Sequence, residues 1–266
     1  MRSLGARLAE GRTAEIYAWD HGQILKLFRD WAPPDLVDYE AKVARSVQSL
    51  GLPVPQVGEI VELDSRRGLV YERVDGKSLL QDFLSRPWTL LRAAQRTADL
   101  HAKVHLLRAP GLTSQRLALE AKIQFAQPLS PHLRRAALRA LTLQPDSDRL
   151  CHGDFHPGNI LITKAGPLVI DWVDATSGNP LADVARTYVL FNLAGQPPGT
   201  SFGMLFQMLR GWFYRAYQQR YFQIRPGSRH ELAAWLPVVA AARLSEDIPE
   251  EQERVLAFVR AQFQEE

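Results

Sequence analysis

The sequence predicts an α+β protein with two lobes: a small, β-rich N-terminal lobe at residues 1–74 and a larger, α-helical C-terminal lobe at residues 75–266, with a cleft between them. Three observations lead to this prediction. The first seventy-odd residues contain short apolar runs that alternate in the manner of strands. Beyond Asp75-Gly76, most apolar residues follow helical spacing instead. The length of 266 residues is enough for two lobes with a buried core.

In the N-terminal lobe, the pattern predicts strands and one helix. A helix opens at Pro33-Pro34, because proline fits the first helical turn, and it closes at Gly51. Runs rich in β-branched and aromatic residues surround this helix, which is typical of an antiparallel sheet. The predicted strands are Ala14–Trp19, Gln23–Phe28, Val57–Glu62 and Gly68–Val74.

The C-terminal lobe reads as helical, with two interruptions. The short apolar runs Ile160–Ile162 and Pro167–Ile170 predict a strand pair, and the chain after Asn179 is helical again. Helical spacing before these runs predicts helices at Leu79–Leu84, Leu90–His105, Ser114–Phe125 and His132–Leu143.

Bulk properties limit the possible partners and compartment. The net charge of +3 is too weak and too dispersed to predict binding to nucleic acid. The single cysteine excludes an intrachain disulfide, which favours a reducing compartment. The longest apolar stretch, Trp235–Ala242, is too short to cross a bilayer, and no apolar signal segment follows the N-terminus. We therefore expect a cytoplasmic protein, monomeric or homodimeric, with no membrane partner.

Two segments carry the chemistry: His152-Gly153-Asp154-Phe155-His156-Pro157-Gly158-Asn159, and Ile170-Asp171-Trp172. Each places polar side chains at the edge of a short apolar run, where a catalytic loop is held rigidly. Phosphoryl transfer needs metal ions on the phosphates and a carboxylate that orients the nucleophile. Asn159 and Asp171 offer the oxygen ligands that Mg²⁺ prefers, and Asp154 is ionised at neutral pH.

The first segment resembles the H-x-D-x-x-x-x-N catalytic loop of kinases. Its variant with His156, where protein kinases usually carry lysine, is most similar to the aminoglycoside phosphotransferase/choline kinase family, and Ile170-Asp171-Trp172 resembles the metal-binding segment of that family. The resemblance covers about Glu10 to Tyr188. It implies a protein-kinase-like fold and an ATP- and Mg²⁺-dependent enzyme that moves the γ-phosphate to a hydroxyl, or an amine, of a small-molecule acceptor.

The same resemblance implies roles for individual residues. Asp154 and His156 are the expected catalytic residues, and Asn159 and Asp171 are the expected metal ligands. The stretch Gly178–Ala185 also resembles the family, in which the aspartate at the position of Asp183 braces the catalytic loop.

An independent pattern in the N-terminal half nominates Lys26 and Glu40. Lys26 shares a strand face with Ile24 and Phe28, and Glu40 lies on the apolar helix stripe between Leu36 and Val43. Because a buried charge needs a partner, we predict a Lys26–Glu40 ion pair. The kinase resemblance implies the same pair, with Lys26 holding the phosphates of ATP.

Nucleotide contacts are expected at two further places. The turn Glu10–Glu15 lies between chain segments of the predicted sheet, and its amides and the Thr13 hydroxyl are candidates for phosphate contacts. The segment after the last predicted strand resembles an adenine-binding linker, in which the Glu72 carbonyl and the Val74 amide pair with the base.

Several alternatives remain open at this stage. The polar segments could form a plain turn, or a metal-dependent phosphoesterase site built on His152, Asp154, His156 and Asn159. A nucleotide-binding pseudokinase without turnover is a further possibility. A protein kinase is disfavoured because no A-P-E-like motif follows Asp171. His101 and His105 share a helix face, and we expect a packed or an exposed pair, because the sequence shows no third metal ligand.

The acceptor is predicted from charge alone. Val184–His230 contains no Asp or Glu but six arginines, whereas a polycationic aminoglycoside calls for carboxylates. We therefore predict that the acceptor is not an aminoglycoside. Two alternatives stay open: the arginines coat solvated helix faces, or acidic residues near the C-terminus fold over the cleft. These acids are Glu246, Asp247, Glu250, Glu251 and Glu253.

Overall fold

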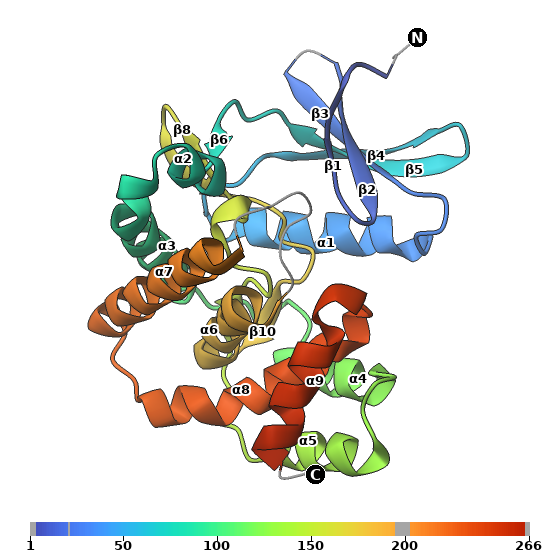
Figure 1. Cartoon of the computed structure of the whole chain (residues 1–266). Coiled ribbons are helices and arrows are strands. Elements are labelled where there is room, and N and C mark those ends of the chain that lie inside the picture. Colours follow the sequence, from blue (N-terminus) through green and yellow to red (C-terminus); the bar gives the residue numbers. More distant parts are fainter. Residues whose placement is uncertain (1–3, 21, 195–202, 264–266) are drawn as a thin grey trace. The chain divides into compact units, whose positions relative to one another are not determined.

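The computed structural model describes residues 4–20, 22–194 and 203–263, and Figure 1 shows its course. Contacts within the chain divide it into two compact units. The sheet unit comprises Met1–Leu79 together with Gly158–Val173, and the helical unit comprises Leu80–Pro157 and Asp174–Glu266. The lobe boundary at Val74 stays a prediction. The contact-based units are not separated at a single point of the chain, since the sheet unit also includes Gly158–Val173.

An antiparallel sheet forms the larger part of the sheet unit, with strand order β1-β2-β3-β5-β4. Each predicted strand is present within two residues of its expected bounds, and β1 is an additional edge strand. The strands are β1 (Arg7–Glu10), β2 (Ala14–Ala18), β3 (Gln23–Phe28), β4 (Val57–Leu63) and β5 (Arg66–Glu72).

The helix α1 (Asp35–Ser49) covers one face of this sheet. Val37 and Ala41 of α1 pack with Phe28 and Leu69 of the strands. Residues that alternate with these along the strands form a separate cluster on the opposite face, consisting of Leu25, Leu27 and Val70. Lys26 therefore lies on the face of β3 that α1 covers.

A second sheet completes the sheet unit. It consists of β6 (Lys77–Ser78), β8 (Ile160–Thr163) and β9 (Gly166–Val169), in the order β6-β8-β9. The β8–β9 hairpin follows from the two apolar runs predicted to be strands, and Gly166 at φ +123° allows the turn between them.

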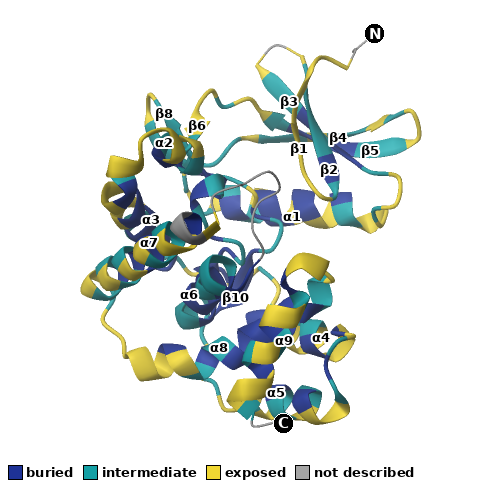
Figure 2. Ribbon diagram, viewed as in Figure 1, coloured by how far each residue is buried: buried dark blue, intermediate teal, exposed yellow. Residues whose placement is uncertain are grey.

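The helical unit is built mainly around α8, which contacts α4, α5, α6 and α9, while α3 packs along α7. Figure 2 shows the buried residues of α8, which include the run from Val238 to Arg243. The helices are α2 (Leu79–Ser85, which begins at the end of the sheet unit), α3 (Leu90–Val104), α4 (Gln115–Phe125), α5 (Pro131–Thr142), α6 (Pro180–Tyr188), α7 (Gly203–Ile224), α8 (Arg229–Arg243) and α9 (Pro249–Phe263). Short 3-10 helices lie at Pro87–Thr89, Pro157–Asn159 and Leu244–Glu246, and a π-helix at Val189–Leu193.

One short strand pair in the helical unit leads into the catalytic segment. β7 (Arg149–Cys151) pairs antiparallel with β10 (Thr176–Gly178), so the residues that follow Cys151 start from a hydrogen-bonded position. Cys151 is buried and burial raises the pKa of its thiol, so the thiol stays protonated and unreactive. The described helices include none with the length and apolar character that a membrane span requires.

The predicted α+β organisation is confirmed, with a strand-rich N-terminal region followed by a predominantly helical one.

Candidate active site

The β8–β9 hairpin brings the two candidate metal ligands to one of its ends. Ile160 pairs with Val169, and the amide of Ile170 donates to the carbonyl oxygen of Asn159 at 2.9 Å. Asn159 and Asp171 therefore flank the same end of the hairpin. Asn159 is buried, whereas the Asp171 side chain is 43% exposed. Asp171 has φ +63°, in the left-handed region that residues other than glycine rarely adopt, and such strain is often found at functional sites.

Lys26 lies between two carboxylates of the sheet unit. Its Nζ is 2.8 Å and 2.9 Å from the two carboxylate oxygens of Glu40, and 3.2 Å from Oδ1 of Asp171. Burial alone would lower the pKa of Lys26, but Asp171 and Glu40 together raise this pKa above its ordinary value. Lys26 is therefore an ammonium, and the predicted Lys26–Glu40 ion pair is present.

Tyr71 completes the surroundings of Glu40. The Tyr71 hydroxyl donates to Oε1 of Glu40 at 2.8 Å. Burial and the Glu40 charge both raise the pKa of Tyr71, so its hydroxyl keeps its proton and remains a donor. Glu40 is thus fixed from β3 and from β5, and it holds the Lys26 ammonium in a defined place.

The turn between β1 and β2 contains Thr13, and Arg29, the residue after β3, holds this turn. The Arg29 side chain donates to the carbonyl oxygens of Arg12 at 3.1 Å and Gly11 at 3.3 Å. The Arg29 backbone amide donates to the carbonyl oxygen of Thr13 at 2.9 Å. The carbonyls of the turn are therefore occupied. Sequence reasoning did not select Arg29, because an arginine at the end of a strand gives no sign of its partners.

The candidate adenine-binding residues follow the end of β5. Glu72 is the last strand residue; its amide donates to the Gln56 carbonyl at 2.9 Å, and its carboxylate accepts from the Gln56 amide at 3.1 Å. Val74 lies beyond the strand, which ends two residues earlier than predicted. A role for Glu72 and Val74 in nucleotide binding stays a prediction.

Asp154 lies in the helical unit, in the loop after β7. Its Oδ2 is 3.4 Å from Nε2 of His156, and its Oδ1 is 4.0 Å from Nη2 of Arg186. The Asp154 amide donates to Nδ1 of His152 at 3.2 Å. Burial alone would raise the pKa of Asp154, but His156 and then Arg186 hold it well below its usual range. Asp154 is therefore a carboxylate at neutral pH and a weak base.

Gly153 is required at its position by two separate constraints. Its φ is +82°, and a Cβ added there would lie 2.4 Å from the carbonyl oxygen of Asp174. Two residues of α6 hold its backbone: Asp183 Oδ1 accepts from the amide at 2.9 Å, and Arg186 Nε donates to the carbonyl at 3.1 Å. Both backbone polar groups of the residue before Asp154 are thus held by hydrogen bonds.

A Gly153→Ala substitution is expected to lower the free energy of unfolding by more than about 2 kcal/mol, because a left-handed alanine costs energy and its Cβ meets a backbone atom. Urea denaturation measures this loss. Gly51→Ala is the matched control, since Gly51 has φ +77° but nothing within 4 Å of its added Cβ. An equal loss in both variants would contradict the close approach at Gly153.

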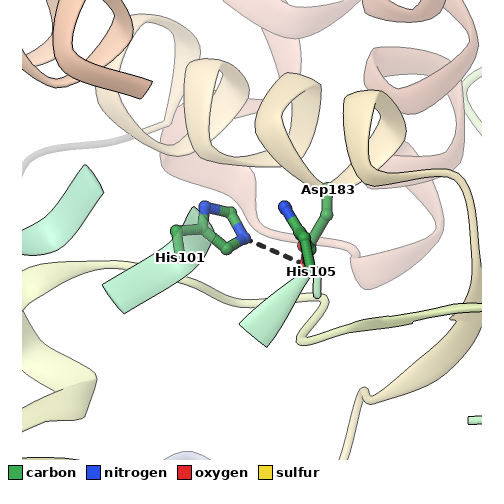
Figure 3. Close-up of side chains that lie close together, drawn as sticks. All are labelled: His101, His105 and Asp183. Atoms are coloured by element: carbon green, nitrogen blue, oxygen red, sulfur yellow. Dashed lines mark hydrogen bonds and ion pairs between the residues drawn. The ribbon is translucent and has the colours of Figure 1, made fainter. Parts of the chain in front are cut away.

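Asp183 accepts hydrogen bonds from the catalytic loop and from α3. Its Oδ2 accepts from the His152 amide at 2.5 Å, and its Oδ1 accepts from the Gly153 amide. Figure 3 shows His101 and His105 approaching the same carboxylate, with their Nε2 atoms 3.1 Å and 3.2 Å from Oδ2. Asp183 therefore joins the loop backbone to α3, in agreement with its expected bracing position.

The two histidines are neutral and each has a fixed tautomer. Burial lowers the pKa of His101 to about 3 and also lowers that of His105. Since each Nε2 faces the Asp183 carboxylate, it carries the ring proton, and Nδ1 accepts from a tyrosine hydroxyl at 2.7 Å: Tyr217 for His101 and Tyr221 for His105.

Asp183 lies beside the two histidines as a third possible metal ligand, a position that the sequence did not reveal. The spacing of His101, His105 and Asp183 would allow them to hold a metal ion. All four ring nitrogens of the histidines already have hydrogen-bond partners, so the arrangement is a satisfied network. Both rings are buried, which is the packed one of the two expected arrangements.

This network makes stability depend on pH. A histidine kept neutral in the fold but titrating near 6.5 when unfolded binds a proton preferentially in the unfolded chain, so stability falls as pH drops below about 6.5. For His101, whose pKa in the fold is about 3, the free energy of unfolding is expected to fall by about 2 kcal/mol between pH 7 and pH 5, and His105 adds a contribution of the same sign. Urea titrations at both pH values measure it. His101→Gln should weaken this pH dependence, with a variant of the exposed His230 as the control; the same pH dependence in His101→Gln as in the wild type would contradict it.

The structure gathers the predicted site residues into two groups. Contacts join Lys26, Glu40 and Asp171 in the sheet unit, and the hairpin adds Asn159. Asp154 and His156 lie together in the helical unit, and the segment that connects them to Asn159 passes from one unit to the other between Pro157 and Gly158. The contacts described above do not join Thr13, Glu72 or Val74 to either group.

The model of the phosphotransferase enzyme family matches residues 6–235. No curated protein sequence gives a significant match.

Three solved structures with a similar fold are described as phosphotransferases or kinases of small molecules. One is a thermostable mutant of an aminoglycoside phosphotransferase in ternary complex with AMP-PNP and hygromycin B (TM-score 0.66, 19% identity, covering 98% of this chain and 91% of that chain). A type VIII aminoglycoside-3′-phosphotransferase has TM-score 0.63 and 19% identity, covering 91% and 93%. An amicoumacin kinase in complex with AMP-PNP and Ca²⁺ has TM-score 0.59 and 14% identity, covering 97% and 87%.

These structures confirm the predicted kinase-like fold, and at such identities they support the fold alone. The family match covers most of the chain and confirms the predicted enzyme class. The chain belongs to the phosphotransferase enzyme family.

Proposed function

We propose that this enzyme transfers the γ-phosphate of ATP, in a magnesium-dependent reaction, to a hydroxyl or amine of a small molecule. The family assignment supports phosphoryl transfer, and two of the similar structures were solved with the ATP analogue AMP-PNP. The observation that carries the proposal is the Lys26 ammonium held between Glu40 and Asp171, at the hairpin end that also presents Asn159.

The donor set at this hairpin end fits magnesium. Asn159 and Asp171 supply an amide oxygen and carboxylate oxygens, which are hard ligands, and Lys26 contacts Asp171 through Oδ1. Magnesium bound there would neutralise charge on the phosphates of ATP. Lys26 supplies a fixed positive charge for the same phosphates, and Glu40 keeps its ammonium in place.

Asp154 is proposed to orient the acceptor. Because its pKa lies well below the usual range, its carboxylate accepts a hydrogen bond from the acceptor hydroxyl instead of removing the proton beforehand. The proton moves to Asp154 late, as the oxygen loses basicity on bonding to phosphorus. His156, 3.4 Å from Asp154, fixes the carboxylate on its Oδ2 side.

The test is transfer of label from [γ-³²P]ATP to a panel of alcohols and amines, measured with magnesium and with excess EDTA. The proposal predicts a labelled small-molecule product with magnesium and none with EDTA. ATP binding without transfer to any compound would contradict it and favour a nucleotide-binding regulator.

The acceptor is proposed to be neutral or anionic. Two of the acids that could have attracted a cationic acceptor are engaged within the protein: Glu246 by Arg186 and Arg243, and Glu251 by Arg243. Carboxylates already paired with buried arginines have little attraction left for a polycation.

We therefore expect no transfer to kanamycin at rates above the background hydrolysis of ATP. The assay is the same label transfer, with kanamycin at millimolar concentration beside the neutral and anionic members of the panel. Robust, magnesium-dependent phosphorylation of kanamycin would refute this acceptor class and leave the kinase activity itself supported.

A further inference from the structure

A row of alternating charges runs from the catalytic loop into the C-terminal helices of the helical unit. Asp154 is followed by Arg186 of α6, Glu246 of the 3-10 helix at Leu244–Glu246, Arg243 of α8 and Glu251 of α9. Arg186 Nη2 is 2.7 Å from Oε1 of Glu246 and 4.0 Å from Oδ1 of Asp154. Segments far apart in the sequence thus share one ionic network.

Most of the row is buried. The side chains of Arg186 and Arg243 are 10% and 9% exposed, and that of Glu251 is 5% exposed. Arg243 contacts Glu246 through Nη1 and Glu251 through Nε, and its Nη2 donates to Glu251 at 3.2 Å. Burying charges is costly unless each has a close partner, so removing one member leaves its neighbour uncompensated.

Arg186 contacts the loop and Glu246 through two of its nitrogens. Its Nε donates to the Gly153 carbonyl, while Nη2 faces Glu246 and, more distantly, Asp154. Each carboxylate oxygen of Glu246 forms an ion pair with an arginine. These contacts tie the loop to the C-terminal segment.

Asp183 and Arg186 bind the two backbone polar groups of the same residue, Gly153, from one face of α6. They are three residues apart on α6, a spacing that puts side chains on one side of a helix. Asp183 accepts from the Gly153 amide and Arg186 donates to its carbonyl. Histidines from the α3 region hold Asp183, whereas Glu246 holds Arg186. The hydrogen bond from Arg186 to the Gly153 carbonyl therefore depends on the C-terminal segment.

We propose that Arg186, held by Glu246, is a positioning residue for Asp154, and that the segment from α8 to α9 is thereby part of the machinery that orients the acceptor. The proposal rests on the proposed function, in which Asp154 orients the acceptor hydroxyl. Misplacing such a group by even an ångström lowers the rate of the chemical step more than it lowers ATP binding.

The first experiment measures hydrogen exchange of the peptide that spans residues 149–156, and it needs no acceptor. Arg186→Gln and Glu246→Gln are expected to speed exchange of the loop amides about tenfold. The first variant removes the hydrogen bond to the Gly153 carbonyl, and the second weakens it by removing the ion pair that holds Arg186. Arg220→Gln is the control, since it removes an arginine of α7 that pairs with the half-exposed Asp99. Unchanged loop exchange in both test variants would overturn the proposal.

The second experiment uses the label-transfer assay with the best acceptor found. Arg186→Gln is expected to lower kcat by about 10- to 100-fold, with KM for ATP changed less than about twofold. Arg186→Lys should restore part of kcat, because a lysine keeps the charge but cannot bridge Gly153 and Glu246 together. The double variant with Glu246→Gln should lose no more than Arg186→Gln alone, since the two act as one unit.

The outcomes separate this inference from the proposed function. If Arg186→Gln does not fold, Glu246→Gln keeps Arg186 and still tests the link by exchange and by kcat. A kcat loss that is equal in Arg220→Gln would overturn the positioning role. Absence of turnover by the wild type with every acceptor would contradict the kinase proposal, while loop exchange still decides whether Arg186 and Glu246 hold the loop.

Discussion

Replacing Asp154 by asparagine is expected to lower kcat by about 10³-fold in the label-transfer assay, within the range typical of a lost acid–base group. The amide keeps the size of the side chain but removes the negative charge that accepts the acceptor proton. It also leaves the cationic side of Arg186, 4.0 Å from Oδ1 of Asp154, without the carboxylate that faces it. KM for ATP is expected to change little, because the Lys26 group belongs to the sheet unit.

Asp148→Asn is the matched control for this change. Asp148 is also an aspartate of the helical unit, but its 42% exposed side chain pairs with Arg108 at the surface, and a surface pair contributes little to stability. Its kcat should equal that of the wild type. An Asp154→Asn enzyme that retains more than about a tenth of wild-type kcat would show that another group orients the acceptor.

The most informative sequence signal for the site was a charged side chain on the apolar face of a predicted strand or helix. Lys26 and Glu40 were paired from strand alternation and helical spacing, because each would otherwise be buried alone, and the structure has their atoms 2.8 Å apart. Local periodicity shows which face of an element a side chain occupies. It can therefore identify two buried charges of opposite sign that need each other as partners. It could not reveal that Tyr71 also binds Glu40, since a tyrosine on a strand needs no charged partner.

The strands that sequence reasoning missed are those without an apolar alternation. All four residues of β1 are exposed, so its sequence carries no sign of a buried face. Three other strands, β6, β7 and β10, have only two or three residues each. Such segments are too short to show a detectable alternation. Their pairing depends on partners remote in the chain, such as Cys151 with Thr176.

The residues that support the site were hidden for a related reason. Arg186 and Glu246 are sixty residues apart in sequence numbering, and neither lies in a motif that names its partner. In the sequence, Arg186 was one of six arginines in an acid-free stretch, and solvated helix faces were an open interpretation of all of them. Its position three residues after Asp183, on the same helix face, is the signal that could have singled it out.

Replacing Asp183 by alanine is expected to lower the free energy of unfolding by about 3–5 kcal/mol, the largest stability effect that we predict. The carboxylate accepts from two loop amides and two imidazole N–H groups, all in a buried site. Alanine leaves these four donors without their acceptor, and a buried donor without a partner is costly. Urea denaturation at pH 7 measures the change.

Asp99→Ala is the control for this prediction, because Asp99 pairs with Arg220 at a site where both side chains are about two-fifths exposed. It should cost less than about 1 kcal/mol. Asp183→Asn should fall between the two, since its amide keeps one acceptor oxygen but turns an N–H₂ group toward donors. If Asp183→Ala costs no more than the control, the loop is held by other contacts.

A double-mutant cycle separates the carboxylate from simple loss of packing. His105 donates to Asp183 through Nε2, so His105→Gln should cost less in the Asp183→Ala background than in the wild type. Packing around the His105 ring, including its contact with Tyr221, is present in both backgrounds and cancels from the comparison. The difference therefore measures the hydrogen bond that joins α3 to the acid holding the catalytic loop. A difference of zero would mean that α3 and the loop are braced independently.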